Sequence, residues 1–353
     1  MKMLLAAIYA KIADLRNTLY DKGVFEVFDT HVRTISIGNI TAGGTGKTPL
    51  AAYVATVLAE RGDNVCILTR GYGRTDAGRR VVVSDWENIL ANAERAGDEP
   101  LELARKLLGK AIVVADADRI AAAEMARRDF GVTAFVLDDG FQHRKLKRDL
   151  DIVCVDATDP FGGGKMLPEG RLREPLHNLI RADAVVITRS DQATNLDLLE
   201  AEVRQLCPNG QIFKARNETA RIVALNEFLS NADSPGTKQL SASIAGVGEG
   251  EIPVVAFCGL GNPDSFFDQL LSGFERIDNR FDLVAAKSFP DHHRYTQQDI
   301  YGLEQIVGES AERILVTTAK DAVKLRGLTF TLPCYVVEIE TVIDNAEQFN
   351  ALL

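Results

Sequence analysis

The sequence predicts an α/β protein in which a mostly parallel sheet is flanked by helices and is followed by a second, smaller α/β domain. Apolar runs rich in β-branched residues alternate with helical patterns along most of the chain, as in sheets covered on both faces. A stretch rich in Ser, Gly and Ala, residues 229–250, interrupts this alternation. The length of 353 residues exceeds one ordinary domain and suits two.

The first domain accounts for the strands and helices before residue 225. Strands are expected at 33–39, 64–69, 79–85, 111–116, 133–140, 151–157 and 182–191, and helices at 47–62, 100–109, 118–129 and 195–206. Because the strands are near-continuous apolar runs separated by helices, we expect them to be parallel. Functional loops then follow the carboxyl ends of the strands.

The second domain repeats the pattern on a smaller scale. It starts with the strand and glycine turn IPVVAFCGLGNP and the helix DSFFDQLLSGF, and it continues through FDLVAAKSF, RILVTTAKDAV and CYVVEIE. Thr296, followed by Asp299, indicates a helix start. We therefore divide the chain into an amphipathic helix at 1–25, a first domain at 26–225, a linker at 226–252 and a C-terminal domain at 253–353.

Composition narrows the classes of function. With 40 basic and 50 acidic side chains the net charge is −10, so we expect no nucleic-acid partner, although a local basic pocket for one phosphorylated ligand is compatible with this charge. The cysteines contain no C-x-x-C pair and lie mostly in apolar runs, as expected of buried thiols in a reducing compartment; they are Cys66, Cys154, Cys207, Cys258 and Cys334. We expect a monomer.

Residues 1–25 have the apolar spacing of an amphipathic helix. The repeat consists of Leu4, Ile8, Ile12, Leu15 and Leu19. A helix that spans a membrane needs about 20 nearly uncharged residues, and this stretch is already charged at its start. Two interpretations remain: a helix packed on a soluble domain, and a helix that lies in a membrane interface. The residues alone favour the packed helix.

The segment SIGNITAGGTGKTPL, residues 36–50, resembles a phosphate-binding loop, but Thr41 stands where the first glycine of G-x-x-x-x-G-K-[ST] belongs. Glycines let backbone amides converge on an anion at the start of a helix. The absence of the first glycine moves the chain reversal onto Gly43 and Gly44. Lys47 is expected to contact the β- and γ-phosphates and Thr48 to ligate Mg²⁺. An ordinary strand-to-helix turn is the simpler alternative.

Acidic residues follow two of the predicted elements. Asp138 and Asp139 end a buried strand. Either carboxylate suits Mg²⁺, and its neighbour would then orient the metal-binding carboxylate or pair with a base. Asp98 and Glu99 precede a helix. They are either simple helix-start residues or the source of a carboxylate that accepts a proton from an attacking hydroxyl.

Other polar motifs give weaker signals. The histidines show no zinc-ligand spacing, so each is by default a structural or supporting residue; they are His31, His143, His177, His292 and His293. Residues 188–191, TRSD, resemble the T-K-x-D motif that reads guanine, with Arg189 in place of lysine. Several arginines lie beside glycine-rich turns. Taken together they favour an anionic acceptor, whereas for any single one surface solvation is an equal alternative. They are Arg70, Arg74, Arg119, Arg171 and Arg173.

Together these stretches resemble one family. SIGNITAGGTGKTP, RGYGR, GDEP, LDDGFQH, LPEGRLREP and TAKDAVKL occur in the order of the tetraacyldisaccharide 4'-kinases of lipid A biosynthesis and cover nearly the whole chain. The resemblance implies a P-loop NTPase-like fold and transfer of the γ-phosphate of ATP to the 4'-hydroxyl of an acylated disaccharide 1-phosphate. It also implies a peripheral protein on the cytoplasmic face of the inner membrane, which promotes the interfacial interpretation of residues 1–25.

The resemblance also implies roles for particular residues. ATP would be bound by Thr41, Ala42, Gly43, Gly44, Thr45, Gly46, Lys47 and Thr48. Mg²⁺ would be held by Thr48 and Asp138, although Asp139 is a rival to Asp138. Asp98 would be the base, His292 (or His293) would support it from the second domain as the hinge closes, and Lys47 and Asp139 complete the catalytic set. The sugar and phosphate of the glycolipid would meet Arg70, Tyr72, Arg74, Arg119 and Arg173.

Two departures from the family pattern stand out. The family usually reads P-A-G-P-L-R-E-P where this chain has Glu169 and Arg171, so we expect altered contacts to the acceptor. The segment 229–250 is also long for a hinge. Two other classes share the phosphate loop: a GTPase-like switch or cofactor-delivery chaperone, and an ATP-dependent ligase with a carboxylate acceptor. A comparison of GTP with ATP binding separates the first from a kinase.

Overall fold

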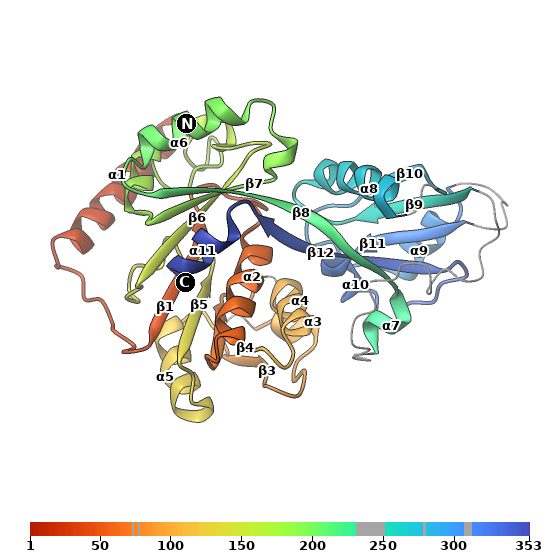
Figure 1. Ribbon diagram of the computed structural model, residues 1–353, viewed down its shortest axis with the longest axis horizontal. Helices are drawn as coiled ribbons and strands as arrows, with labels where there is room; N and C mark the ends of the chain where they lie inside the picture. The colour runs from red at the N-terminus through yellow and green to blue at the C-terminus, as the bar shows by residue number, and fades with distance from the viewer. Residues whose placement is uncertain (73, 77, 231–250, 278–279, 307–312) are drawn as a thin grey trace. The chain divides into compact units, whose positions relative to one another are not determined.

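A computed structural model describes the chain except residues 73, 77, 231–250, 278–279 and 307–312. The described residues form two compact units (Figure 1). The first comprises Met1–Arg216 together with Thr341–Leu353, and the second comprises Asn217–Glu340. Most of the linker predicted at 226–252 lies outside the described residues, which do not include 231–250.

The sheet of the first unit confirms the predicted fold class. Its strands follow the order β3-β4-β2-β5-β1-β6-β7-β8, and every neighbouring pair from β4 to β8 is parallel, whereas β3 is antiparallel at the edge. The bounds are β1 Arg33–Asn39, β2 Val65–Thr69, β3 Val81–Ser84, β4 Ala111–Ala115, β5 Ala134–Asp138, β6 Leu150–Asp156, β7 Ala184–Thr188 and β8 Gln211–Ala224. The central position of β1 places the loop that follows it between the ends of β5 and β6.

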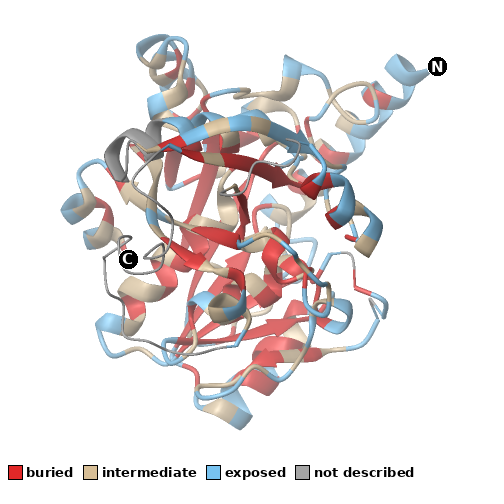
Figure 2. Ribbon diagram, turned by 90° about the vertical axis from the view of Figure 1, so that its right-hand side faces the viewer, coloured by how far each residue is buried: buried red, intermediate tan, exposed pale blue. Residues whose placement is uncertain are grey.

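Helices cover both faces of this sheet. Alternate residues of β2 and β5, such as Cys66 and Phe135, pack on α5, whereas α2 contacts the same strands from the opposite face. The strands are accordingly buried, as the red ribbons in Figure 2 show. The helices are α1 Lys2–Asp21, α2 Lys47–Glu60, α3 Ala93–Ala96, α4 Asp98–Lys106, α5 Arg119–Phe130, α6 Leu196–Leu206 and α11 Ala346–Leu352, with 3₁₀ turns at Gly162–Gly164, Leu176–Arg181 and Ser190–Gln192.

The second unit has its own sheet and core. Its strands follow the order β10-β9-β11-β12-β8, and apolar clusters lie on both faces. Thr296 caps α9 and forms a capping box with Asp299, as predicted. The remaining bounds are α7 Leu225–Leu229, β9 Ile252–Cys258, α8 Pro263–Ile277, β10 Phe281–Ser288, α9 Gln297–Glu304, β11 Ile314–Thr318, α10 Ala319–Ala322 and β12 Cys334–Ile343.

The end of the chain differs from the expected domain boundary at 253–353. β12 begins in the second unit, and residues from Thr341 onward belong to the first. The reason is packing: Phe349 of α11 is fully buried and contacts the rings of Tyr53 and Phe213. Asn350 adds a hydrogen bond from the Tyr53 hydroxyl, 3.0 Å.

The helix expected at 1–25 is α1, and its apolar side chains are largely exposed. The helix at the N-terminus in Figure 2 is accordingly drawn mostly in pale blue and tan. The exposed apolar residues of α1 are Met3, Leu4, Leu5, Ile8, Tyr9, Ile12 and Leu15, whereas Ala6, Ala13 and Asn17 are buried. Among the described residues, none of the helices combines the length and apolar character that crossing a membrane requires.

Candidate active site

The loop between β1 and α2 has the backbone of an anion site. Gly43 (φ 123°) and Gly46 (φ 77°) adopt positive φ, a region that glycine tolerates. Chain reversal therefore falls on Gly43 and Gly46 rather than on Gly43 and Gly44. In the described chain, no acceptor receives a backbone N–H from any residue of 43–47. Such amides, at the start of α2, suit an anionic ligand.

Thr41 does not need to be glycine, because it is part of a short backbone pairing and lacks a positive φ. It forms an antiparallel bridge with Leu172, and the flanking bonds join Ala42 N to Arg171 O (2.7 Å) and Arg173 N to Ile40 O (2.8 Å). Thr41 is 2% exposed, so this strand-like anchor is buried. The segment 171–173 thus fixes the start of the loop.

Lys47 lies between the loop and Asp139. Its ammonium is 3.4 Å from the Gly43 carbonyl oxygen and 3.7 Å from Asp139 Oδ1. Arg173 Nη1 contacts both oxygens of Asp139, at 2.7 and 2.8 Å. Burial opposes ionisation of Asp139, but Lys47 and Arg173 outweigh it and lower the pKa of this carboxyl. Asp139 is therefore a carboxylate held by two cations.

Asp138 has the opposite surroundings. Burial, with Glu99 and Asp139 nearby, raises its pKa to about 7. Oδ2 accepts a bond from the Thr69 hydroxyl at 3.2 Å, whereas the buried Oδ1 has no hydrogen-bond partner among the described residues. The Thr48 hydroxyl likewise has no partner in the described chain. A buried carboxylate oxygen without a donor fits a cation ligand.

Asp98 is at the first position of α4 and is 7% exposed. Close backbone packing joins its loop to the RGYGR turn. A Cβ on Gly97 would lie 2.6 Å from the Tyr72 carbonyl oxygen, and one on Gly71 would lie 2.9 Å from that of Ala96. The GDEP and RGYGR motifs, which are separated along the chain, thus pack against each other in the first unit.

The candidate acceptor-binding residues fall into three groups. Arg70 and Tyr72 are exposed after β2. Arg74 and Arg119 are buried, and each donates to a backbone carbonyl, of Ala115 at 2.8 Å and of Asp116 at 3.0 Å. Arg173 is bound to Asp139. Arg119 is close enough to Asp138 and Asp139 for their charges to oppose the effect of burial, which lowers its pKa.

The two candidate histidines lie in the second unit. His293 stacks on Phe289 and lies 3.2 Å from an Asp299 oxygen. His292 has a positive φ of 59°, and its Nε2 lies 3.7 Å from Asp291 Oδ2. The contacts of His293 are those of a structural residue.

Sequence reasoning missed polar residues that hold the site together. Gln142 donates to the Asn39 carbonyl at 2.9 Å and Asn39 donates to the Thr45 hydroxyl at 2.8 Å. The position of Gln142 inside LDDGFQH was the available signal. Thr188 and Arg189 of TRSD contact the loop backbone, a role that the comparison with guanine-reading motifs did not suggest.

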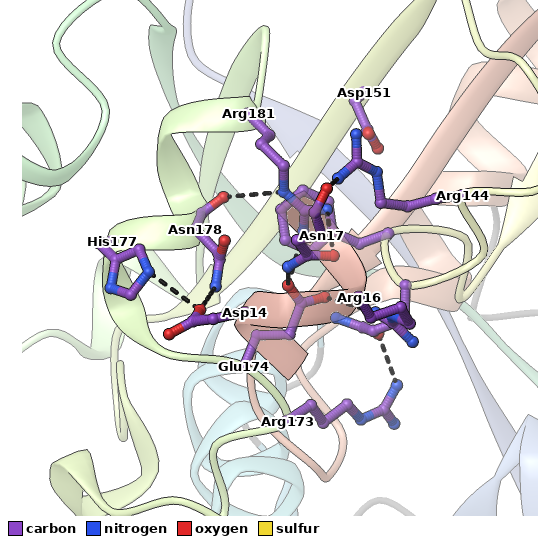
Figure 3. Close-up of polar contacts among 12 residues, drawn as sticks. Asp14, Arg16, Asn17, Arg144, Asp151, Arg173, Glu174, His177, Asn178 and Arg181 are labelled. Atoms are coloured by element: carbon purple, nitrogen blue, oxygen red, sulfur yellow. Dashed lines mark hydrogen bonds and ion pairs between the residues drawn. The ribbon is translucent and has the colours of Figure 1, made fainter. Parts of the chain in front are cut away.

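Glu174 connects the site to α1. It is fully buried next to Arg173, and it accepts hydrogen bonds from Asn17 (2.5 Å) and Arg181 (2.9 Å) and lies 3.6 Å from Arg16. Figure 3 shows Asn17 among Glu174, Arg181 and Arg144. Helix α1 is thus attached through polar contacts to the segment that carries Arg173.

Within the described residues, the amides of the glycine-rich loop have no acceptor, Lys47 and Thr48 end this loop, and two carboxyl groups lie at the end of β5. These features define a nucleotide-binding protein of the P-loop class. Comparison with known proteins gives the family. The chain belongs to the family described as Tetraacyldisaccharide-1-P 4'-kinase, which matches residues 2–353.

Curated relatives and a solved structure agree with this assignment. The tetraacyldisaccharide 4'-kinase of Halothermothrix orenii is 40% identical over 91% of this chain and 81% of its own length. That of Desulfatibacillum aliphaticivorans is 35% identical over 99% and 90%. LpxK from Aquifex aeolicus, solved as the "apo" form in complex with ATP, is 30% identical, has a TM-score of 0.72, and is matched over 99% of this chain and 96% of that one. The chain is therefore a kinase of lipid A biosynthesis that acts on the 4' position of a tetraacyldisaccharide 1-phosphate.

Proposed function

We propose that this kinase takes the γ-phosphate from ATP, bound by residues 41–48, and that Asp98 is the base for the 4'-hydroxyl. The observation that carries the proposal is that no described residue accepts the amides of 43–47, a loop that ends in Lys47. Phosphoryl transfer requires positioning and charge neutralisation more than covalent help. The amides and the Lys47 ammonium supply both on the donor side.

The metal site is proposed at Thr48 and Asp138. Their side-chain oxygens fit a cation because neither Asp138 Oδ1 nor the Thr48 hydroxyl has a hydrogen-bond partner among the described residues. Asp139 fits less well, since Arg173 contacts both of its oxygens. Mg²⁺ held there would neutralise charge on the phosphates. Asp139, in turn, would keep Lys47 oriented.

Asp98 is proposed to accept the proton of the attacking hydroxyl. A carboxylate at the start of α4 is buried enough to be fixed in place. For the supporting histidine we retain His292 on the PDHH motif. Its rival His293 stacks on Phe289 and contacts Asp299 within the second unit.

The acceptor is proposed to meet Arg70 and Tyr72 first. Both side chains are exposed, and Arg70 makes no hydrogen bond or ion pair to another described residue. Arg74 and Arg119 would act from buried positions, and Arg173 through its contact with Asp139. A guanidinium suits a phosphorylated sugar because it can donate to two oxygens at once.

Helix α1 is proposed to rest on the cytoplasmic face of the inner membrane as a peripheral anchor. Its exposed apolar residues repeat at helical spacing, whereas its polar contacts attach it to the first unit. Burying each such side chain in lipid would contribute about 1.5–3 kcal/mol at most. The glycolipid substrate would then be reached at the membrane surface.

The test is incubation with ATP labelled at the γ-phosphate and a tetraacyldisaccharide 1-phosphate, followed by chromatography of the lipid. We expect the wild-type protein to transfer label to the lipid and the Lys47→Met variant to transfer none. GTP in place of ATP should give little product, and chelation of Mg²⁺ should stop transfer. Full transfer by the Lys47→Met variant would contradict the assignment of ATP to residues 41–48.

A further inference from the structure

The carbonyl groups of the phosphate loop are bound by side chains from elsewhere in the first unit. Arg171 Nε donates to Ala42 O (2.9 Å), Arg189 Nη1 to Gly44 O (3.0 Å) and the Thr188 hydroxyl to Thr45 O (2.9 Å). With Lys47 3.4 Å from Gly43 O, every carbonyl from Ala42 to Thr45 has a donor. We call Arg171, Thr188 and Arg189 the carbonyl clamp.

The clamp determines where the amides point. In a planar trans peptide the N–H of the next residue is directed away from the C=O. Carbonyls of Ala42, Gly44 and Thr45 that face the clamp therefore turn the amides of Gly43, Thr45 and Gly46 away from it. These are amides that have no acceptor in the described chain. Holding the carbonyls on one side leaves the donors on the other for an anion.

Both arginines are themselves fixed by aspartates from one segment. Arg171 Nη1 lies 2.6 Å from Asp159, and Arg189 forms an ion pair with Asp156, which is 3% exposed at the end of β6. Arg171 also lies against Gly43, since a Cβ there would be 2.4 Å from its Nη2. The guanidinium therefore covers the loop directly, while the φ of 123° is what favours glycine at this position.

We propose that Arg171 and Arg189 are positioning residues that hold residues 42–45 in the phosphate-binding conformation. The pairing of Thr41 and the clamp together hold a loop that lacks the first glycine of the pattern. A loop held in its bound conformation loses less entropy when ATP binds. This inference rests on the proposed binding of ATP phosphates at 41–48.

Arg171 is the more informative of the two to replace. Its side chain is 44% exposed and its partner Asp159 is 41% exposed, so Arg171→Leu should fold. Lys165→Met is a matched control, because Lys165 is an exposed cation of the same segment whose one ion pair among the described residues is with Glu169, at 2.7 Å.

The experiment measures KM for ATP, KM for the lipid acceptor and kcat, with the melting temperature in the absence of ATP. For Arg171→Leu we expect KM for ATP to rise about tenfold, or about 1.4 kcal/mol, with KM for the acceptor unchanged and kcat within about threefold. Arg171→Lys, which retains a cationic donor group, should recover part of the loss. Asp159→Asn should raise KM for ATP less than Arg171→Leu does. The double variant Arg171→Leu, Asp159→Asn should have the same KM for ATP as Arg171→Leu, because both changes remove the same ion pair. Arg189→Met should also raise KM for ATP, and Lys165→Met should match the wild type.

Two outcomes would overturn the inference. The first is an unchanged KM for ATP in Arg171→Leu. The second is a variant in which both KM values rise, kcat falls to a similar extent and the melting temperature is lower. Lys47→Met distinguishes this failure from failure of the proposed function. If it abolishes transfer while Arg171→Leu behaves as wild type, only the clamp is wrong. If Lys47→Met is fully active, the assignment of ATP to the loop is wrong.

Discussion

Asp138 and Asp139 are neighbours in the chain, yet they meet different surroundings at the end of β5. Asp139 faces the cations of Lys47 and Arg173, which lower its pKa despite burial, whereas burial raises the pKa of Asp138 to about 7. Two adjacent carboxyls can thus serve different purposes. The two carboxyls differ because Lys47 of α2 and Arg173 of the segment 171–173 both contact Asp139.

At the residue scale we predict that Asp98→Asn lowers kcat by about 10²–10⁴-fold, the usual contribution of a general base. KM for ATP should stay near the wild-type value, because Asp98 lies on α4 and not in the phosphate loop. Steady-state kinetics with labelled ATP would check both values. Wild-type turnover in the variant would exclude Asp98 as the base.

His143 gives a prediction for pH. Burial, followed by the charges of Arg119 and Arg148, lowers its pKa from 6.5 to about 4. The unfolded chain therefore takes up this proton first as the pH falls, and the stability from a neutral His143 is present above pH 6.5 and is lost between 6.5 and 4. His143→Gln cannot be protonated, so its free energy of unfolding should fall by about 1–3 kcal/mol less than that of the wild type from pH 7 to pH 5.

Urea unfolding at both pH values would measure this difference. The comparison uses the change with pH within each variant, so a packing loss in His143→Gln that is independent of pH cancels. The same decrease in both proteins would mean that His143 does not contribute to acid sensitivity.

At the element scale, α1 combines an attached face with an exposed one. Asp14 contacts His177 and Asn178 at 3.0 and 2.9 Å, and Asn17 contacts Glu174, so the second half of the helix is fixed by polar bonds (Figure 3). The exposed apolar side chains lie mostly in the first half. Deleting the whole helix would remove Asn17 and Arg16 from the buried Glu174, so substitutions test membrane binding more cleanly than truncation does.

We predict that the triple variant Leu4→Gln, Ile8→Gln, Ile12→Gln loses most sedimentation with vesicles of anionic phospholipid. These side chains are 67%, 46% and 59% exposed, so the fold should be unaffected. KM for the lipid acceptor should rise, whereas KM for ATP should not. Lys2→Gln is the control, since it changes charge but not the apolar face. Equal sedimentation of triple variant and wild type would count against an interfacial helix.

The elements that the sequence predicted correctly share a local signal. The strand before the phosphate loop, the acids at the end of β5 and the capping box at Thr296 all depend on residues close together in the chain. The carbonyl clamp joins residues 129 and 145 positions apart, so no local pattern contains it. The long strand β8 was missed because its sequence, QIFKARNETARIVA, is interrupted by charged and polar residues.

At the scale of the whole molecule, the chain is not divided into successive domains. It leaves the first unit along β8, whose residues after Arg216 belong to the second unit, and it returns along β12. The expected boundaries failed here because hydrophobic periodicity identifies elements but not their partners. Phe349, near the chain end, shows the consequence: it completes the core of the unit that holds the phosphate loop.

We therefore predict that Phe349→Ala destabilises the first unit by about 3–5 kcal/mol, the usual cost of removing a buried aromatic side chain. Phe349 is fully buried against Tyr53 of α2 and Phe213 of β8, and α2 begins at Lys47. With ATP bound to the loop of the first unit as proposed, saturating ATP should recover part of the lost melting temperature. Thermal unfolding with and without ATP measures both effects. Glu347→Ala on the exposed side of the same helix should change stability by less than about 0.5 kcal/mol. If Phe349→Ala were as stable as Glu347→Ala, the chain end would not be part of this core.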